Sequence, residues 1–332
     1  MLNALLVILG PTAVGKTEVA VDLLSKIKGE IISADSRQIY KEMDIGTAKP
    51  SKEIREKIPH HLVDVVFPDE VFNAAEFGLK ARAIIKKLQK GDKLPVLVGG
   101  SGLYIKAAVD GLFVGPGADW HLRKRLREKA DKEGRGALYR ELKKVDPEAA
   151  SHIHPNDERR IVRALEVYEL SGEKISAFQR RSSSPLPNVV MVGLRKGRDS
   201  LYRSINKRVD KMIKEGLIEE VRGLLARGYS EELPSMQGLG YRQIIGYLKG
   251  KYPKEEAVRL IKRDTRRFAR RQLNWFKRDK RITWLDVEKY SSTRDVSYKI
   301  LDILQQRVYR KKCSAGHKIC QNVAQAFRPD KM

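Results

Sequence analysis

The sequence is poor in cysteine and has no long apolar run, and each shortage excludes a class of protein. It contains 2 cysteines in 332 residues, which argues against a disulfide scaffold and for a reducing compartment, so we expect a cytoplasmic protein. No stretch approaches the roughly 20 apolar residues of a membrane-spanning helix, and we expect no membrane partner. The N-terminal apolar run, residues 4–9, is short and has no basic leader, which predicts a first strand and not a signal peptide. A hydrophobic content of 41% indicates a globular chain, long enough for more than one domain.

Acidic residues are scarce relative to basic ones. The 67 Lys and Arg residues outnumber the 42 Asp and Glu residues, and the formal net charge is +25. Such a surplus favours a polyanionic partner, most often nucleic acid. A basic surface that only serves solubility, or one that attracts anionic lipid, remains an alternative on charge alone.

The densest basic segment comes late in the chain. Residues 259–281 contain eleven Lys or Arg residues and two acidic ones. The pattern predicts a helix over 254–280 in which Phe268, Trp275 and Phe276 pack on the core while the arginines face outward. A charge run is commonly a solvated face, but the scarcity of acids here favours contact with phosphates.

The most specific motif is a phosphate-binding loop between residues 10 and 17. The segment reads G-x-x-x-x-G-K-T, and it lies between an apolar run and a helical pattern, which is the context the motif requires. Backbone N–H groups of such a loop converge on phosphate oxygens, and the following helix adds a partial positive charge. Lys16 would reach a phosphate, and the Thr17 hydroxyl would bind Mg²⁺. The candidate phosphate ligands are Gly10, Pro11, Thr12, Ala13, Val14, Gly15, Lys16 and Thr17.

Strand and helix patterns alternate over residues 1–110. Strands are expected over residues 4–9, 30–34, 61–66 and 94–98, and a helix over 74–90. This alternation is typical of an α/β fold, a parallel sheet flanked by helices as in P-loop NTPases. Because ligands bind at the carboxyl ends of parallel strands, we expect the phosphate loop, Asp35 and the segment 99–101 to converge.

The pattern changes after residue 111. Residues 119–176 are helical and basic, a strand resumes at 189–194, and further helices are expected over 201–215, 217–226, 239–248 and 296–308, with a last strand at 283–285. We therefore assign residues 1–115 and 186–290 to a discontinuous α/β core. Residues 116–185 form a helical insertion domain, and residues 291–332 a C-terminal helix and flexible tail.

The sequence lacks the second strand-end aspartate that holds Mg²⁺ in motor ATPases and GTPases. The strand over 94–98 ends in Gly-Gly, and the only strand-end acid close behind the loop is Asp35, followed by Ser36, Arg37 and Gln38. In such a cluster the carboxylate could act as a general base while the neighbouring polar side chains recognise a ligand. A small-molecule kinase that uses ATP, and a non-catalytic RNA-binding protein with a vestigial loop, both remain open.

These motifs resemble the tRNA dimethylallyltransferases, or tRNA isopentenyltransferases, of the bacterial type. The resemblance rests on the loop and, in this order, on the segments 35–40, 44–50, 99–104, 156–160, 163–166 and 240–243. It implies transfer of a dimethylallyl group from its diphosphate to N6 of the adenosine 3′ of the anticodon in tRNA. The loop would hold the diphosphate with Mg²⁺ and not ATP, and the helical insertion would bind the anticodon stem-loop. We expect a monomer.

The resemblance also suggests catalytic roles. Asp35 is the expected base on the exocyclic amine of adenine. Lys16, the loop N–H groups and Arg208 would stabilise the leaving diphosphate. Thr12 would touch the diphosphate or the amine. For Thr47 and Lys49 a role in lining the site and a plain loop role are equally open.

A larger set of residues is expected to contact the tRNA. By resemblance it comprises Asp35, Ser36, Arg37, Gln38, Ser101, Arg123, Arg159, Arg160, Ile161, Val162, Arg163, Gln237, Gly238, Leu239, Gly240, Tyr241 and Arg242. The family commonly has Thr where this chain has Ser101, and an uncharged polar residue where it has Arg159.

Three residues near the C-terminus have side chains that bind zinc. Cys313, His317 and Cys320 are one ligand short of a structural site, and their spacing is unusual. We expect no zinc there.

Overall fold

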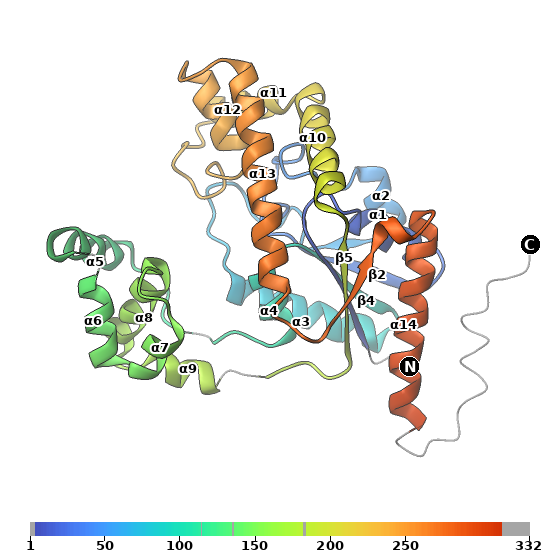
Figure 1. Cartoon of the computed structure of the whole chain (residues 1–332), viewed down its shortest axis with the longest axis horizontal. Helices are drawn as coiled ribbons and strands as arrows, with labels where there is room; N and C mark the ends of the chain where they lie inside the picture. The colour runs from blue at the N-terminus through green and yellow to red at the C-terminus, as the bar shows by residue number, and fades with distance from the viewer. Residues whose placement is uncertain (1–3, 114, 135, 182–183, 314–332) are drawn as a thin grey trace, which may run out of the picture. The chain divides into compact units, whose positions relative to one another are not determined.

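The computed structural model describes residues 4–113, 115–134, 136–181 and 184–313; for residues 308–313 it describes the backbone only. The chain divides into two compact units. The first combines the segment up to Val109 with the segment from Leu186 onward, and the second runs from Asp110 to Pro185. Figure 1 shows the course of the chain through both.

The first unit is built on a parallel sheet of six strands, counted over the described residues. Its strands lie in the order β3-β2-β4-β1-β5-β6. Their bounds are β1 (Leu5–Leu9), β2 (Gly29–Ala34), β3 (His60–His61), β4 (Leu94–Gly99), β5 (Val189–Arg195) and β6 (Ile282–Asp286). The register pairs Leu9 with Gly99 on one side and with Gly193 on the other, so β1 and β4 end level and β5 continues two residues further, to Arg195. The expected α/β fold is confirmed, and it brings the loops that follow these strands to one edge of the sheet.

Helices cover this sheet. They are α1 (Lys16–Leu24), α2 (Lys52–Lys57), α3 (Ala74–Lys90), α4 (Gly102–Val109), α10 (Arg198–Lys214), α11 (Leu217–Ala226), α12 (Tyr241–Leu248), α13 (Lys254–Phe276) and α14 (Thr293–Cys313), with a short 3-10 helix over Val287–Lys289. Helix α3 illustrates why they form. The side chain of Asn73, the residue before it, caps its first turn, and the helix buries Phe77, Ala81 and Ile85 at helical spacing. Figure 1 shows α13 beside α10 and α12, and α14 beside α1.

One local expectation for the first unit was wrong, and one helix was missed. The strand expected over 61–66 is limited to His60–His61 and an isolated bridge between Tyr40 and Val66. Leu62 and Asp64 have φ values of 60° and 55°, so the backbone turns instead of extending. The short helix α2 was not expected, and it starts where the Ser51 side chain accepts a hydrogen bond from the N–H of Ile54.

The second unit is helical throughout its regular structure. Its helices are α5 (Trp120–Glu133), α6 (Gly136–Val145), α7 (Pro147–His152), α8 (Glu158–Ser171) and α9 (Ile175–Arg181). Aspartates cap three of them, at Asp119, Asp146 and Asp157. Leu142 and Leu165 lie in a separate apolar core. No helix in the described parts of either unit is long and apolar enough to cross a membrane.

Candidate active site

The phosphate loop has the geometry of an anion site. Gly10 and Gly15 have φ values of 148° and 101°, and Ala13 also adopts a positive φ of 62°. A Cβ on Gly10 would lie 2.4 Å from the carbonyl oxygen of Leu194, so only glycine fits there. Gly15 caps α1 without a side chain. The N–H groups of the first turn of α1 are therefore left open to an anion.

Lys16 lies folded over this loop. Its Nζ donates a hydrogen bond to the carbonyl oxygen of Pro11 at 2.7 Å. Burial lowers the pKa of Lys16 to about 8, and the nearby charge of Arg208 acts in the same direction, whereas Asp35 acts in the opposite one. The loop thus holds the positive charges of Lys16 and Arg208 close together, which is an arrangement that a diphosphate would stabilise.

Arg208 reaches the loop from α10. Its Nη1 donates to the hydroxyl of Thr12 at 3.2 Å. The two residues are 196 positions apart in the sequence, and the expectation for Arg208 came from family resemblance alone. The structure brings the guanidinium and the loop together, as the proposed role in charge stabilisation requires.

Asp35 follows β2 at the same edge of the sheet. Its Oδ1 accepts a hydrogen bond from the backbone N–H of Arg37 at 2.9 Å, which fixes the carboxylate in a tight turn. The next residue, Ser36, donates its N–H to the hydroxyl of Ser101 at 3.0 Å. Ser101 in turn donates its N–H to the carbonyl of Ala34 at 3.1 Å. The predicted acid and the predicted segment 99–101 therefore meet.

Gln38 and Arg37 use their side chains inside the protein. The amide of Gln38 accepts from the hydroxyl of Ser33 at 2.9 Å and donates to the carbonyl of Ala48 at 3.1 Å. Arg37 donates from Nη1 to the carbonyl of Pro234 at 2.7 Å. Gln38 thus holds the loop that contains Ala48, and Arg37 holds the loop that contains Pro234.

For Thr47 and Lys49 the structure supports the loop role. The ammonium of Lys49 is buried and donates to the carbonyl of Tyr40 at 2.6 Å and to the carboxylates of Asp44 and Asp64 at 2.6 and 2.5 Å. Thr47 donates its hydroxyl to the carbonyl of Met43 at 2.6 Å. The donors of both side chains are therefore used within the loop and not turned toward a substrate.

Tyr241 is a core residue, which removes its side chain from the surface expected to touch RNA. Its hydroxyl donates to Oε1 of Glu220 at 2.6 Å, and its ring fills the space beside Gly46, where a Cβ would lie 2.5 Å from a ring carbon. Glu220 also accepts the N–H groups of residues 44–46. Of the neighbouring candidates, Gln237 and Arg242 are exposed, Leu239 is half-buried, and Gly238 and Gly240 are buried.

In the second unit, two of the expected RNA contacts hold a buried carboxylate. Glu166 is 0% exposed, and it accepts two hydrogen bonds from Arg123 at 2.7 and 2.9 Å and one from Arg163 at 2.6 Å. Burial alone would raise the pKa of Glu166, but these bonds and the N–H of Asp119 hold it below its usual value. Both guanidinium groups are therefore part of the fold of this unit.

The other second-unit candidates divide by exposure. Arg159 and Arg160 are exposed on the first turn of α8. Ile161 and Val162 are buried in the helical core, and their side chains cannot contact RNA. The first two remain candidates, and the last two form the apolar face that fixes α8.

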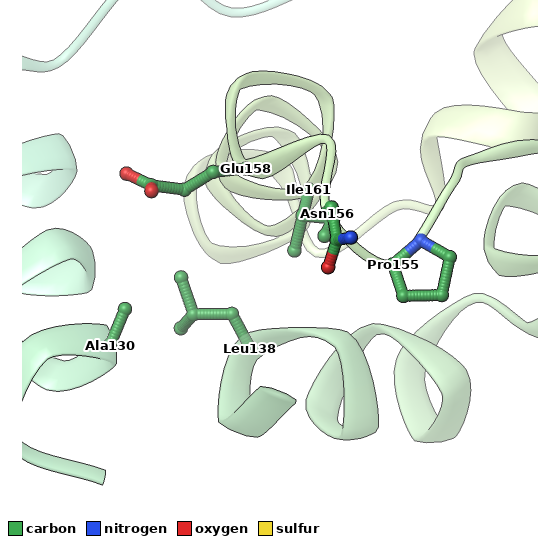
Figure 2. Close-up of a pocket in the computed structure, with 6 residues that line it drawn as sticks. All are labelled: Ala130, Leu138, Pro155, Asn156, Glu158 and Ile161. Atoms are coloured by element: carbon green, nitrogen blue, oxygen red, sulfur yellow. The ribbon is translucent and has the colours of Figure 1, made fainter. Parts of the chain in front are cut away.

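A small pocket also lies in the second unit. It has a volume of about 70 Å³. Figure 2 shows Leu138, Asn156 and Ile161 around it, with Ala130, Pro155 and Glu158 completing the lining. This is far below the roughly 300 Å³ at which ligand pockets begin, so it has no room for a diphosphate ester or a base.

The arginine-rich helix α13 contributes a residue that was not expected. Phe276 is buried as predicted, but Phe268 and Trp275 are 38% and 41% exposed, so packing of those two rings on the core was wrong. They lie outside the buried stripe that contains Ala269 and Gln272. Gln272 contacts the phosphate loop, and the signal for it in the sequence is a polar residue on the apolar face of an otherwise basic helix.

A divalent cation would find few protein ligands. The described residues contain no group of three or more His, Cys, Asp or Glu side chains that could hold a metal ion. The hydroxyl of Thr17, on the first turn of α1, is an oxygen ligand of the kind Mg²⁺ accepts alongside phosphate oxygens. His317 and Cys320 lie outside the described residues, as does the side chain of Cys313.

A phosphate loop and a strand-end carboxylate at one edge of a parallel sheet define an α/β enzyme that acts on a phosphate ester. More narrowly, the chain belongs to the IPP transferase family, whose model matches residues 38–279.

Several relatives are similar over nearly the whole chain. A tRNA dimethylallyltransferase of Pelotomaculum thermopropionicum is 51% identical over 298 residues, which cover 89% of this chain and 95% of the relative. One of Alkaliphilus oremlandii is 48% identical over 303 residues, covering 91% and 97%. Among solved structures, a tRNA isopentenylpyrophosphate transferase from Bacillus halodurans aligns with a TM-score of 0.68 at 40% identity, covering 93% of this chain and 99% of that one. A eukaryotic dimethylallyltransferase acting on tRNA aligns with a TM-score of 0.71 at 26% identity, covering 96% and 81%.

Proposed function

We propose that this protein transfers a dimethylallyl group from dimethylallyl diphosphate to N6 of the adenosine 3′ of the anticodon in tRNA. The observation that carries the proposal is one site in which a cationic phosphate loop, with Lys16 and Arg208, lies near the carboxylate of Asp35. A loop of this kind suits a diphosphate leaving group, and a fixed carboxylate suits a base. Membership of the family supports the same reaction.

The leaving group is bound by the loop and its two cations. As the allylic C–O bond breaks, its electron pair stays on the diphosphate, and negative charge grows there. The open N–H groups of α1, the ammonium of Lys16 and the guanidinium of Arg208 stabilise that charge more strongly as it develops. Mg²⁺, held by the Thr17 hydroxyl and the diphosphate, would supply further positive charge at the same oxygens.

The acceptor is activated by Asp35. The exocyclic nitrogen of adenine is a poor nucleophile because its lone pair is delocalised into the ring. When N6 forms its bond to the allylic carbon, it must lose a proton, and the carboxylate of Asp35 accepts it. The bond from the N–H of Arg37 holds Oδ1, so we assign the proton transfer to the other carboxylate oxygen.

The RNA has to present an unstacked base. Enzymes that modify a base extrude it from its stack, and unpaired bases are read by stacking and by edge contacts. On α13, Phe268 and Trp275 are exposed, and the guanidinium of Arg271 lies 5.8 Å from the ring centroid of Phe268. Exposed rings among arginines suit bases and phosphates together. We assign the phosphate contacts of α8 to Arg159 and Arg160. We also infer that the protein is a monomer and that it acts in the cytoplasm.

The decisive experiment combines purified protein, Mg²⁺, dimethylallyl diphosphate and unmodified bulk tRNA, followed by digestion and mass spectrometry of the nucleosides. We expect an adenosine heavier by one dimethylallyl group, absent without the diphosphate and strongly reduced with Asp35→Asn. If no such nucleoside forms and ATP is consumed with a small acceptor, the protein is a kinase. If neither occurs and tRNA still binds, it is a non-catalytic RNA-binding protein.

A further inference from the structure

Gln272 bridges two loops of the active site with one buried side chain. Its Oε1 accepts a hydrogen bond from the backbone N–H of Thr12 at 2.9 Å. Its Nε2 donates to the backbone carbonyl of Gly100 at 3.0 Å. The residue is 7% exposed, and its two partners belong to the loops that follow β1 and β4. One amide therefore satisfies a backbone donor on one loop and a backbone acceptor on the other.

Two glycines make this approach of α13 sterically feasible. A Cβ on Gly100 would lie 2.2 Å from Nε2 of Gln272, and a Cβ on Gly102 would lie 2.2 Å from Nε1 of Trp275. Both distances are far below contact, so a side chain at position 100 would displace the amide of Gln272, and one at position 102 would displace the ring of Trp275. The helix and the loop after β4 are thus shaped for one another.

The bridge connects the groups assigned to the two substrates. On one side, Thr12 accepts a hydrogen bond from Arg208, which we assign to the diphosphate. On the other, Gly100 precedes Ser101, whose hydroxyl accepts the N–H of Ser36, the residue after Asp35. The sheet fixes the strand ends but not the loops beyond them, and Gln272 spans the two loops.

We propose that Gln272 is a positioning residue for the transferase reaction: it sets the separation between the diphosphate loop and the base-bearing loop. The inference rests on the proposed function. Gln272 does not touch substrate in this role and acts through Thr12 and Gly100. Displacements of about 1 Å in such an arrangement can lower a rate about 100-fold.

The role requires an amide. In Gln272→Glu, an ionised carboxylate would still accept from Thr12 but could not donate to Gly100, and in Gln272→Met the side chain of similar size would do neither. Once protonated, the carboxyl group of the first variant would again be both donor and acceptor. The activity of Gln272→Glu should therefore recover at low pH, which a role in packing alone would not produce.

The test compares Gln272→Met and Gln272→Glu with Thr265→Val. Thr265 is a buried polar residue of the same helix, and its hydroxyl donates within the helix, to Ile261 at 2.7 Å. We expect Gln272→Met to lower kcat about 10- to 100-fold, with tRNA affinity within about twofold of the parent. Thr265→Val should lose comparable thermal stability and keep its kcat. For Gln272→Glu, the ratio of its kcat to that of the parent should rise as pH falls, because protonation of the new carboxyl group restores the donor to Gly100.

A readout independent of activity separates this inference from the proposed function. Hydrogen exchange of the Thr12 amide should accelerate in Gln272→Met and not in Thr265→Val, whether or not the parent modifies tRNA. If the parent does not modify tRNA, the proposed function fails, but the exchange result still shows whether Gln272 holds the amide of Thr12. Unchanged kcat in Gln272→Met, unchanged exchange at Thr12, or an equal loss of kcat in Thr265→Val would each overturn the positioning role.

Discussion

Arg208 donates a hydrogen bond to the hydroxyl of Thr12 at 3.2 Å, across 196 positions of sequence. The contact places a cation from α10 at the tip of the phosphate loop, beside Lys16. Burial and Arg208 together depress the pKa of Lys16, so the two positive charges repel one another until an anion is bound. The two cations together therefore suit a ligand that carries several negative charges, such as a diphosphate.

The first prediction concerns Arg208. Arg208→Gln should lower kcat by about 100- to 1,000-fold, the range seen when one donor to a developing oxyanion is removed. The matched control is Lys207→Gln, which removes one charge from a neighbouring position of the same helix and should leave kcat unchanged. Steady-state kinetics with saturating tRNA make the comparison. Equal effects of the two changes would show that only the overall charge of α10 matters.

The second prediction concerns Asp35. Asp35→Asn keeps an oxygen to accept the N–H of Arg37, so the turn should persist. It removes the proton acceptor, and transfer should fall by about 100-fold or more. Affinities for dimethylallyl diphosphate and for tRNA, measured by titration, should stay within about twofold. Full transfer activity in this variant would exclude Asp35 as the base.

The third prediction concerns pH. Because the pKa of Lys16 is lowered to about 8 in the free protein, its ammonium is charged below that pH and loses its proton above it. Affinity for dimethylallyl diphosphate should therefore weaken as pH rises from about 7 to about 9.5, a range in which the substrate itself stays ionised. Binding measured at constant ionic strength checks this. A flat profile would mean that Lys16 keeps its proton or does not contact the diphosphate.

The parts of the site that the sequence could predict are those fixed by local pattern and by the parallel sheet. The loop motif identified Lys16 and Thr17, and alternation of strands and helices implied that Asp35 and Ser101 would lie at the same edge. Arg208 was predicted as a site residue only through family resemblance. Nothing local indicated its bond to Thr12.

Other contacts depend on tertiary packing that no short pattern encodes. Gln272 meets Thr12 across 260 positions of sequence. Tyr241 and Arg163 belong to motifs shared with the family, and the sequence could not distinguish a residue that touches RNA from one that supports the fold. The contacts show a supporting role for each: Tyr241 fills the core beside Gly46, and the half-buried Arg163 pairs with Glu166.

The fourth prediction concerns the RNA surface of α8. Arg159→Gln and Arg160→Gln should each weaken tRNA binding and reduce the slope of log affinity against log salt by about 0.7 to 0.9. The control is Lys90→Gln, which removes the same charge at the end of α3, beside the start of β4 and thus at the opposite edge of the sheet from the phosphate loop. Filter binding at several salt concentrations gives the slopes. A slope equal to that of the parent would move the phosphate contacts elsewhere.

The fifth prediction separates Arg163 from its neighbours on α8. Arg163→Gln removes one of the two guanidinium partners of the fully buried carboxylate of Glu166; because Arg123 still compensates the charge, the expected cost is about 1.5–3 kcal/mol, that of one hydrogen bond to a charged group. The control, Arg125→Gln, breaks an exposed pair with Glu169 and should cost about 1 kcal/mol or less. Hydrogen exchange of the α5 and α8 amides reports the stability of the second unit directly. Because the cost falls on folding, loss of tRNA binding in Arg163→Gln should accompany faster exchange and be restored at low temperature. If binding is lost while exchange is unchanged, Arg163 contacts the RNA itself, and its bond to Glu166 serves to aim the guanidinium.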